Sequence, residues 1–199
     1  DDLPKYQPSE YRHQGRSRGD NNLISQALTI LSQSTRPVVI AANAARYGLP
    51  SDVLQAFIEA TGLPLFTIEQ ARGLVSDDHP LCFGYADAGV NQPAQHFRDA
   101  DTILLLGKRL DHRYRYGKPP FFNSDARIIQ VDPSPAEIGR NRGVTLGILG
   151  DLGGVVEQLT DGAHNYHWPD IAPWIDLLTT ARRLHLESLE ENAVEDLPL

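Results

Sequence analysis

The feature that most constrains the fold is a series of short, continuous apolar runs that alternate with amphipathic segments. The runs are rich in Val, Ile and Leu, and they cover residues 36–42, 63–68, 101–107, 128–132 and 144–149. A strand that reads as an unbroken apolar run is buried on both faces, as in parallel sheets covered by helices. The alternation predicts a doubly wound α/β fold: a mostly parallel sheet of about six strands with helices on both faces.

The segments between these runs predict the helices. Apolar residues from Ile24 to Leu31 recur at helical spacing, a second helix begins near Pro50 and ends at Gly62, and residues 93–100 suit a short helix. The sequence Ser134-Pro-Ala-Glu has the composition of a capping box and predicts a helix of one or two turns. The last two helices follow Gly150-Asp151 and Ile171, and the stretch between the second and third runs reads as irregular.

Length and composition set the domain organisation. A chain of 199 residues with 41% hydrophobic side chains can bury one ordinary core. We expect a linker or strap at 1–20, a central domain at 21–162, and a connector with a C-terminal helix at 163–199 that leads towards another domain. The chain has no methionine and begins with Asp1, so we expect an excised piece of a longer polypeptide.

Charge and cysteine content exclude several partners. The formal charge is −8, which argues against nucleic acid because such binding needs many Lys and Arg contacts to phosphate. No apolar run is long enough to cross a bilayer, so no membrane partner is expected. The single Cys82 lies in an apolar context and reads as a packed structural residue, and one cysteine favours a reducing, cytoplasmic compartment.

The candidate binding residues lie where strands end. Ligands of doubly wound sheets bind at the carboxyl ends of the strands, near the point where strand order reverses. This rule selects Asn43 after the first run and five cations: Arg46, Arg72, Lys108, Arg109 and Arg113. These cations could hold a phosphate group. Equally, they could pair with Asp77, Asp111 and neighbouring acids in a solvated rim.

Asp132 is a second kind of candidate. An acid at a strand end can accept the ribose hydroxyls of an adenosine, or it can bond its own backbone in the turn Asp-Pro-Ser-Pro. The first strand-to-helix turn, residues 41–45, contains no glycine, which weakens the case for a dinucleotide. His164 and His167 have no third ligand nearby, and no serine sits in a nucleophile elbow. We therefore assign no metal ligands and no catalytic residues.

The order and spacing of several segments resemble the central domain of thiamine diphosphate (ThDP)-dependent enzymes, such as acetolactate synthase, oxalyl-CoA decarboxylase and benzaldehyde lyase. The resemblance runs from about residue 36 to 159. The segments that carry it are Arg36-Pro-Val-Val-Ile, Ala56-Phe-Ile-Glu-Ala-Thr-Gly-Leu-Pro, Asp78-His-Pro-Leu, Ala100-Asp-Thr-Ile-Leu-Leu-Leu-Gly-Lys-Arg-Leu-Asp, Ala126-Arg-Ile-Ile-Gln-Val-Asp-Pro-Ser-Pro-Ala-Glu-Ile-Gly and Gly150-Asp151.

The resemblance implies a Rossmann-like fold of the DHS-like NAD/FAD-binding kind. It implies a parent lyase or transferase that acts on 2-keto acids or 2-hydroxy ketones, is a homo-oligomer, and holds ThDP and magnesium in separate pyrimidine-binding and diphosphate-binding domains. It places FAD or ADP contacts on Arg109, Asp132 and Asp151. Residues 42–44 and 87–89 depart from the pattern of FAD-binding members, so ADP or no ligand remains as open as FAD.

Two alternatives stay open on the sequence alone. The chain could be a free-standing nucleotide-binding enzyme of the sirtuin or oxidoreductase kind, since those sheets are similarly wound. It could also be an interaction module that presents apolar helix faces through Ile24, Leu28, Trp174 and Ile175. Under the leading hypothesis the isolated chain has a structural and nucleotide-binding role and is inactive alone.

Overall fold

A computed structural model of the chain describes residues 16–195, with side chains up to residue 191. Residues 1–15 of the predicted strap lie outside the described residues. The elements are α1 (Asn21–Ser32), β1 (Pro37–Ala41), α2 (Asn43–Gly48), α3 (Ser51–Thr61), β2 (Leu65–Thr67), the 3-10 helix η2 (Glu69–Ala71), β3 (Cys82–Tyr85), η3 (Gln92–Asp99), β4 (Thr102–Leu106), η4 (His112–Gly117), β5 (Arg127–Asp132), β6 (Leu146–Leu149), α4 (Leu152–Ala163) and α5 (Ala172–Glu195).

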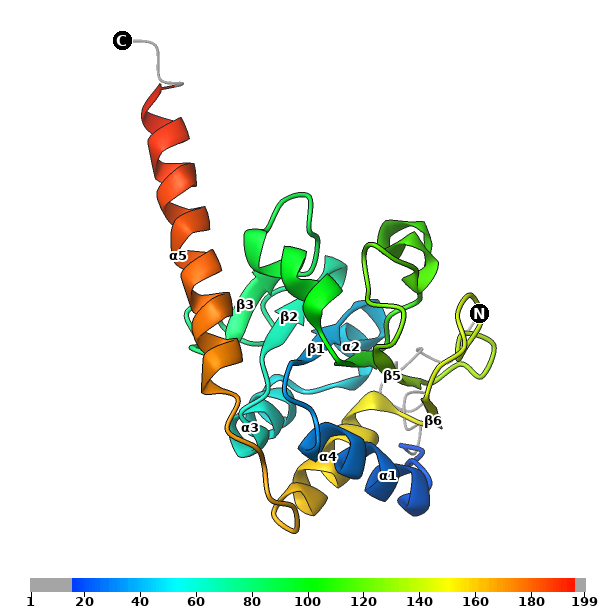
Figure 1. Cartoon of the computed structure of the whole chain (residues 1–199). Coiled ribbons are helices and arrows are strands. Elements are labelled where there is room, and N and C mark those ends of the chain that lie inside the picture. The colour runs from blue at the N-terminus through cyan, green and yellow to red at the C-terminus, as the bar shows by residue number, and fades with distance from the viewer. Residues whose placement is uncertain (1–15, 196–199) are drawn as a thin grey trace, which may run out of the picture.

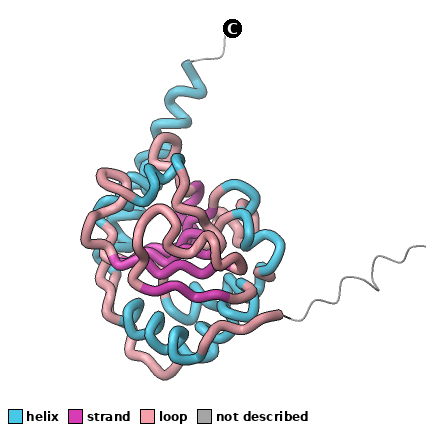
Figure 2. The backbone as a smooth tube through the Cα atoms, turned by 90° about the vertical axis from the view of Figure 1, so that its right-hand side faces the viewer, coloured by secondary structure: helices cyan, strands magenta, loops and turns pink. Residues whose placement is uncertain are grey.

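The strands of the described region form one sheet in the order β3-β2-β1-β4-β5-β6. Every pairing in it is parallel, which confirms the predicted doubly wound α/β class. From β1 the chain adds strands β2 and β3 on one side of the sheet, and from β4 it adds β5 and β6 on the other side. The topological switch point, where ligands of such sheets bind, therefore lies between these two central strands. Figure 2 shows the strands in the middle of the molecule with helices around them.

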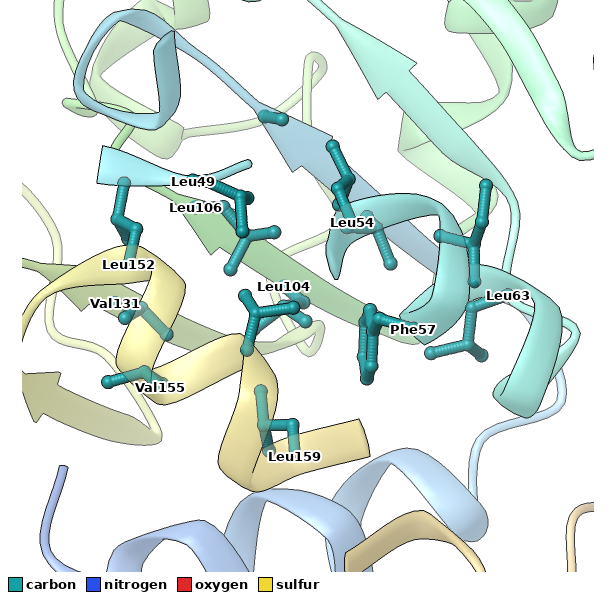
Figure 3. Packing of buried hydrophobic residues seen from close by; sticks show 14 of the residues in the cluster. Leu49, Leu54, Phe57, Leu63, Leu104, Leu106, Val131, Leu152, Val155 and Leu159 are labelled. Atoms are coloured by element: carbon teal, nitrogen blue, oxygen red, sulfur yellow. The ribbon is translucent and has the colours of Figure 1, made fainter. Parts of the chain in front are cut away.

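Alternate residues of the strands build two cores, one on each face of the sheet. Val39, Leu104 and Ile129 point towards a cluster completed by α1, α2, α3 and α4. Figure 3 shows the centre of this cluster, where Phe57 and Leu159 meet Leu104. On the other face, the neighbouring strand residues pack against η3, η4 and α5. Burial on both faces explains why the strands read as continuous apolar runs.

The structure corrects three local expectations. The stretch read as irregular contains β3, which pairs with β2. A short helix, α2, begins at Asn43, inside the segment expected to be only a turn. The helix predicted from Ser134 does not form: the residues are turns, because the Ser134 amide donates to Asp132 Oδ1 (2.9 Å) and Gln130 Oε1 accepts from the Gly139 amide (3.0 Å).

The last helix, α5, belongs only partly to the body. Its first turns are anchored by Trp174, which is buried and donates from Nε1 to the carbonyl of Pro37 (2.8 Å). Leu178 continues this buried stripe. One turn further on, Ala181 is buried and Arg182 Nη1 donates to the carbonyl of Cys82 (3.0 Å). Beyond these residues the helix extends away from the body (Figure 1), and Leu184, Leu186 and Leu189 are exposed.

Candidate functional site

A cavity of about 370 Å³ opens at the switch point, where β1, β4 and β5 end. It is lined by Asn43, Ala44, Glu69, Gly107, Lys108, Arg109, Asp111, Asp132, Pro133, Ser134 and Glu137. A larger groove, of about 880 Å³, lies between α1 and α4, away from the strand ends. Because the smaller cavity occupies the position that strand topology favours for ligands, it is the candidate site.

Gly107 lets the floor of the cavity form. It follows β4 directly and has a φ of +65°, a left-handed conformation that favours glycine. A Cβ on Gly107 would lie 2.6 Å from the Cβ of Ala44 and 3.0 Å from the amide nitrogen of Ala45. The missing side chain thus allows α2 to approach the end of β4. The small side chains of Ala44 and Ala45 allow the same close approach from the side of α2.

Asp132 lies at the end of β5 and is only 5% exposed. Its Oδ1 accepts from the Ser134 amide (2.9 Å), so the turn geometry expected as an alternative role is present. Burial raises the pKa of Asp132, and the nearby charge of Glu137 raises it further, while the Ser134 amide and the Arg109 guanidinium oppose this. The carboxylate therefore has one oxygen used by the turn and an incomplete set of partners.

Arg109 and Glu137 line the same cavity and form an ion pair there. The Arg109 side chain is 66% exposed, and its Nε lies 3.5 Å from Oε1 of Glu137. The same carboxylate oxygen lies 3.3 Å from Nη1 of Arg140. An exposed guanidinium held by one shared carboxylate can turn towards an incoming phosphate at little cost, because exposed ion pairs contribute little stability.

Lys108 also lines the cavity, but its ammonium group is already paired with carboxylates of the protein. Its side chain is 2% exposed, and its Nζ lies 3.0 Å from Asp111 Oδ2 and 3.5 Å from Glu69 Oε1. It also lies 4.7 Å from the centre of the Tyr114 ring. This buried ammonium is balanced by two carboxylates, so we infer a structural role.

The five cations predicted at this edge mostly follow the alternative of a paired rim. Lys108, Arg109 and Arg113 contact carboxylates, and Arg72 pairs with Asp77. Within the described residues Arg46 has no ion pair, and it lines a separate hollow.

Two further predicted contacts, Asn43 and Asp151, have different positions. Asn43 lines the cavity, and its Oδ1 accepts from the Gln70 amide (3.2 Å). Asp151 lies outside the cavity, where it caps α4 by accepting from the Gly154 amide (3.1 Å). The structure thus brings Asn43, Arg109 and Asp132 together and places Asp151 at the adjoining helix.

Sequence reasoning missed Glu137 as part of the site. Its side chain is 12% exposed, and it lines the cavity next to Asp132. The local sequence assigned it to a helix cap, and nothing in that composition indicates the turn that brings it back to the strand end.

Other kinds of chemistry have little support in residues 16–195. No three His, Cys, Asp or Glu side chains in this range gather so that they could hold a metal ion. No helix in the same range is long and apolar enough to span a bilayer. Cys82 is buried, and burial raises the pKa of its thiol, as expected for a packed structural cysteine.

Comparison with known proteins identifies the fold family. The family model described as thiamine pyrophosphate enzyme, central domain, matches residues 24–159. Thiamine pyrophosphate is another name for ThDP. Among solved structures, one described as a thiamin diphosphate-dependent enzyme from Mycobacterium smegmatis matches with a TM-score of 0.62 at 18% identity, over 78% of this chain and 29% of the other.

Curated relatives come from the same group of enzymes. The chain is 28% identical over 186 residues to 2-hydroxyacyl-CoA lyase 1 of Mus musculus, a match that covers 92% of this chain and 31% of the relative. It is 36% identical over 136 residues to the lyase of the same name in Dictyostelium discoideum, covering 66% and 22%. It is 25% identical over 173 residues to oxalyl-CoA decarboxylase of Escherichia coli K12, covering 87% and 29%.

The chain therefore spans less than a third of the length of these relatives. The family model, in contrast, covers more than half of the chain and includes every strand of the sheet. On this evidence the chain belongs to the family of thiamine pyrophosphate enzyme central domains.

Proposed function

We propose that this chain serves as the central domain of a longer ThDP-dependent enzyme that makes or breaks a carbon–carbon bond next to a carbonyl, in 2-keto acids or 2-hydroxy ketones. Family membership and the names of the relatives support this proposal. Under this proposal, residues 21–162 form the central domain, and residues 163–199 lead to a neighbouring domain of the parent chain. The pyrimidine-binding and diphosphate-binding domains of a homo-oligomeric parent would hold ThDP and magnesium.

The cavity at the switch point is proposed to bind the ADP moiety of ADP or FAD. The main observation in support of this proposal is that Arg109 and Asp132 line the same cavity at the ends of β4 and β5. Its volume, about 370 Å³, lies in the range of roughly 300–1,000 Å³ typical of small-molecule sites. Arg109 would contact phosphate, Asp132 would accept the ribose hydroxyls, and Asn43 would contribute its side-chain amide.

Asp151 would act on this site indirectly, because it caps α4 outside the cavity. Two features of the site oppose tight binding of a diphosphate. The turn after β1 lacks the glycines that let a pyrophosphate approach, and Glu137 and Glu69 leave negative charge at the rim.

Melting of the purified chain with ADP, FAD, NAD, coenzyme A or ThDP with magnesium tests the proposal. A ligand at about 100 times its Kd adds about 2.7 kcal/mol, or about 5–11 °C in Tm for a chain of this size. We expect a shift with ADP or FAD that Arg109→Ala and Asp132→Ala abolish. Arg140→Ala is the matched control, because Arg140 shares Glu137 with Arg109 but does not line the cavity.

Two outcomes would contradict the proposal. A nucleotide shift that survives both substitutions would place the ligand elsewhere, and no shift with any nucleotide would leave the cavity without a ligand role. Turnover of a 2-keto acid by the isolated chain with ThDP and magnesium would refute the assignment of the chemistry to other domains.

A further inference from the structure

The distal turns of α5 carry leucines that the described chain leaves half exposed. Leu184, Leu186 and Leu189 are 47%, 53% and 51% exposed, and the helix continues to Glu195, away from the body (Figure 1). Most helical stability in proteins comes from packing of an apolar face, and a few helical turns that stand alone in water are marginal. Apolar side chains that gather on one exposed element indicate a docking surface.

The three leucines lie on two different faces of the helix. Residues three, four or seven apart share one face of an α-helix. Arg182, Leu186 and Leu189 are spaced by four and three and form one stripe. Arg182 attaches the start of this stripe to the body, because its Nη1 donates to a carbonyl of β3 (3.0 Å). Leu186 and Leu189, which we call the seam, are therefore left for a partner. Leu184 lies seven residues after Leu177, on the side opposite the seam.

Two opposite charges flank the seam on the same side. Arg183 and Glu190 are seven residues apart, and both are exposed. The Arg183 Nη1 atom lies 2.7 Å from Oε1 of Glu187 in an exposed ion pair, which contributes little stability and can open at little cost. Glu190 makes no ion pair within residues 16–191. Along this flank the helix is therefore positive near the body and negative towards its end.

This pattern of charge is complementary to itself in one orientation only. Spacings of three and four are those by which two helices pack along a seam, and charges beside the seam set their orientation. In an antiparallel pair the same flank of both helices meets, whereas in a parallel pair different flanks meet. Two antiparallel α5 helices would therefore bring Arg183 of each copy against Glu190 of the other. The two ion pairs would enclose the leucines of both seams.

We propose that the seam of α5 docks the seam of a second copy of this chain in antiparallel orientation, with Arg183 paired to Glu190 on both sides. Four half-exposed leucines bury far less than the roughly 1,200 Å² of a stable complex. The association is therefore weak and reversible: the dilute chain is a monomer, and pairing grows with concentration or where a larger assembly holds two copies close together. None of these residues lines the cavity at the switch point, so the proposal is independent of nucleotide binding.

Analytical ultracentrifugation of the chain between about 10 µM and 1 mM tests the proposal. We expect mostly monomer at the lower concentration and mostly dimer at the higher one, as for a Kd of about 0.1 mM. Leu186→Ala and Leu189→Ala should each raise the Kd about tenfold, because each removes apolar area from both copies. Leu184→Ala is the matched control, since it removes an equally exposed leucine from the opposite face, and it should leave the Kd unchanged.

Charge reversal tests the orientation of the pair. Arg183→Glu and Glu190→Arg should each weaken self-association, because each sets like charges against one another in the dimer. An equimolar mixture of the two variants should associate about as tightly as wild type, because both flanking pairs are then of opposite charge. A substitution that merely disturbed the helix would not be rescued by mixing. The effect should be largest at low ionic strength, since salt screens exposed charges.

Three outcomes would overturn the proposal. A wild-type chain that stays monomeric at 1 mM would leave this face of α5 to a neighbouring domain of the parent chain. Equal weakening by Leu184→Ala and Leu189→Ala would mean that the copies meet through another face. A mixture of the charge variants that associates no better than either variant alone would exclude the antiparallel pair. Circular dichroism of the dilute variants should match that of wild type, because every substituted side chain is exposed.

Discussion

At the scale of single residues, Asp101 is the most heavily bonded carboxylate of the described chain. It accepts from the Thr35 amide (2.8 Å), the Thr35 hydroxyl (2.9 Å) and the Arg36 amide (3.1 Å), and also from the Ser34 hydroxyl. Burial alone would raise its pKa, but these hydrogen bonds outweigh burial and lower it. The carboxylate thereby fixes the turn between α1 and β1 against the start of β4.

Asp101→Asn should destabilise the fold, because an amide offers one acceptor oxygen where the carboxylate uses two, and donors that include the buried Ser34 hydroxyl lose their partner. We expect a loss of about 1–3 kcal/mol, which corresponds to a Tm lower by about 2–12 °C. The lowered folded pKa means that the stabilisation is present above the unfolded pKa, near 3.8, and is lost as pH falls through the folded value. The Tm difference between variant and wild type should therefore shrink below about pH 4. Asp99→Asn, at a more exposed ion pair, is the control and should change Tm little.

Asp132 has the opposite electrostatic character. Because its folded pKa is raised, the ionised form costs stability, and this cost grows as pH rises from the unfolded pKa through the folded pKa. Asp132→Asn keeps an acceptor for the Ser134 amide and removes the buried charge. We expect a higher Tm than wild type at pH 7 and no difference well below pH 3.8. A lower Tm at neutral pH would show that the carboxylate has a stabilising partner.

The candidate site could be predicted from the sequence only where its residues follow strands. Asn43, Arg109 and Asp132 each follow a recognisable apolar run, and the topology of parallel sheets brings strand ends together. Glu137 could not be found in this way, because a turn several residues beyond the strand sets its position. Asp151 follows the run before α4, but its carboxylate is taken up by the helix cap.

At the scale of elements, the contact between α2 and the end of β4 depends on one glycine. Gly107→Ala would add a Cβ at 2.6 Å from Ala44 and would also strain a φ of +65°. The left-handed conformation costs about 1–2 kcal/mol and the overpacking about 1–3 kcal/mol more. We expect a combined loss of about 2–5 kcal/mol in chemical denaturation.

Gly62→Ala is the matched control for this prediction. Gly62 has a similar φ of +70°, but nothing lies within 4 Å of the position of its Cβ. Only the conformational cost should appear there, about 1–2 kcal/mol. Equal losses at the two positions would mean that α2 does not press against β4 as described.

The element predictions that were wrong have a shared physical origin. β3 has only four residues and contains Gly84 at a φ of +82°, so it lacks the length and the regularity that identify a strand. The sequence from Ser134 has good helix-start composition, but Asp132 and Gln130 take up its backbone groups. Tertiary hydrogen bonds overrode local propensity there. The long, periodic elements were predictable because burial itself creates their pattern.

At the scale of the whole molecule, α5 is anchored at one end. Trp174→Ala should remove a buried ring and its hydrogen bond to Pro37, at a cost of about 3–5 kcal/mol. Leu189→Ala, on the part of the helix that extends from the body, should change the free energy of unfolding by about 0.5 kcal/mol or less. Urea unfolding measures both. A comparable loss at Leu189 would reveal a contact of the distal turns that the structure does not show.

The strand order also has a consequence for how the chain reaches this structure. β1 pairs with β4, and the bonded ends of this pair, Arg36 and Asp101, are 65 residues apart in sequence. Closing so long a loop costs entropy before any contact compensates for it, and chains rich in such distant pairings fold slowly. Strands β2 and β3 can join β1 over shorter distances. The pairing of β1 with β4, which forms the candidate site at its carboxyl end, would therefore be the rate-limiting step of folding. Substitutions at this pairing should slow folding as well as alter ligand binding.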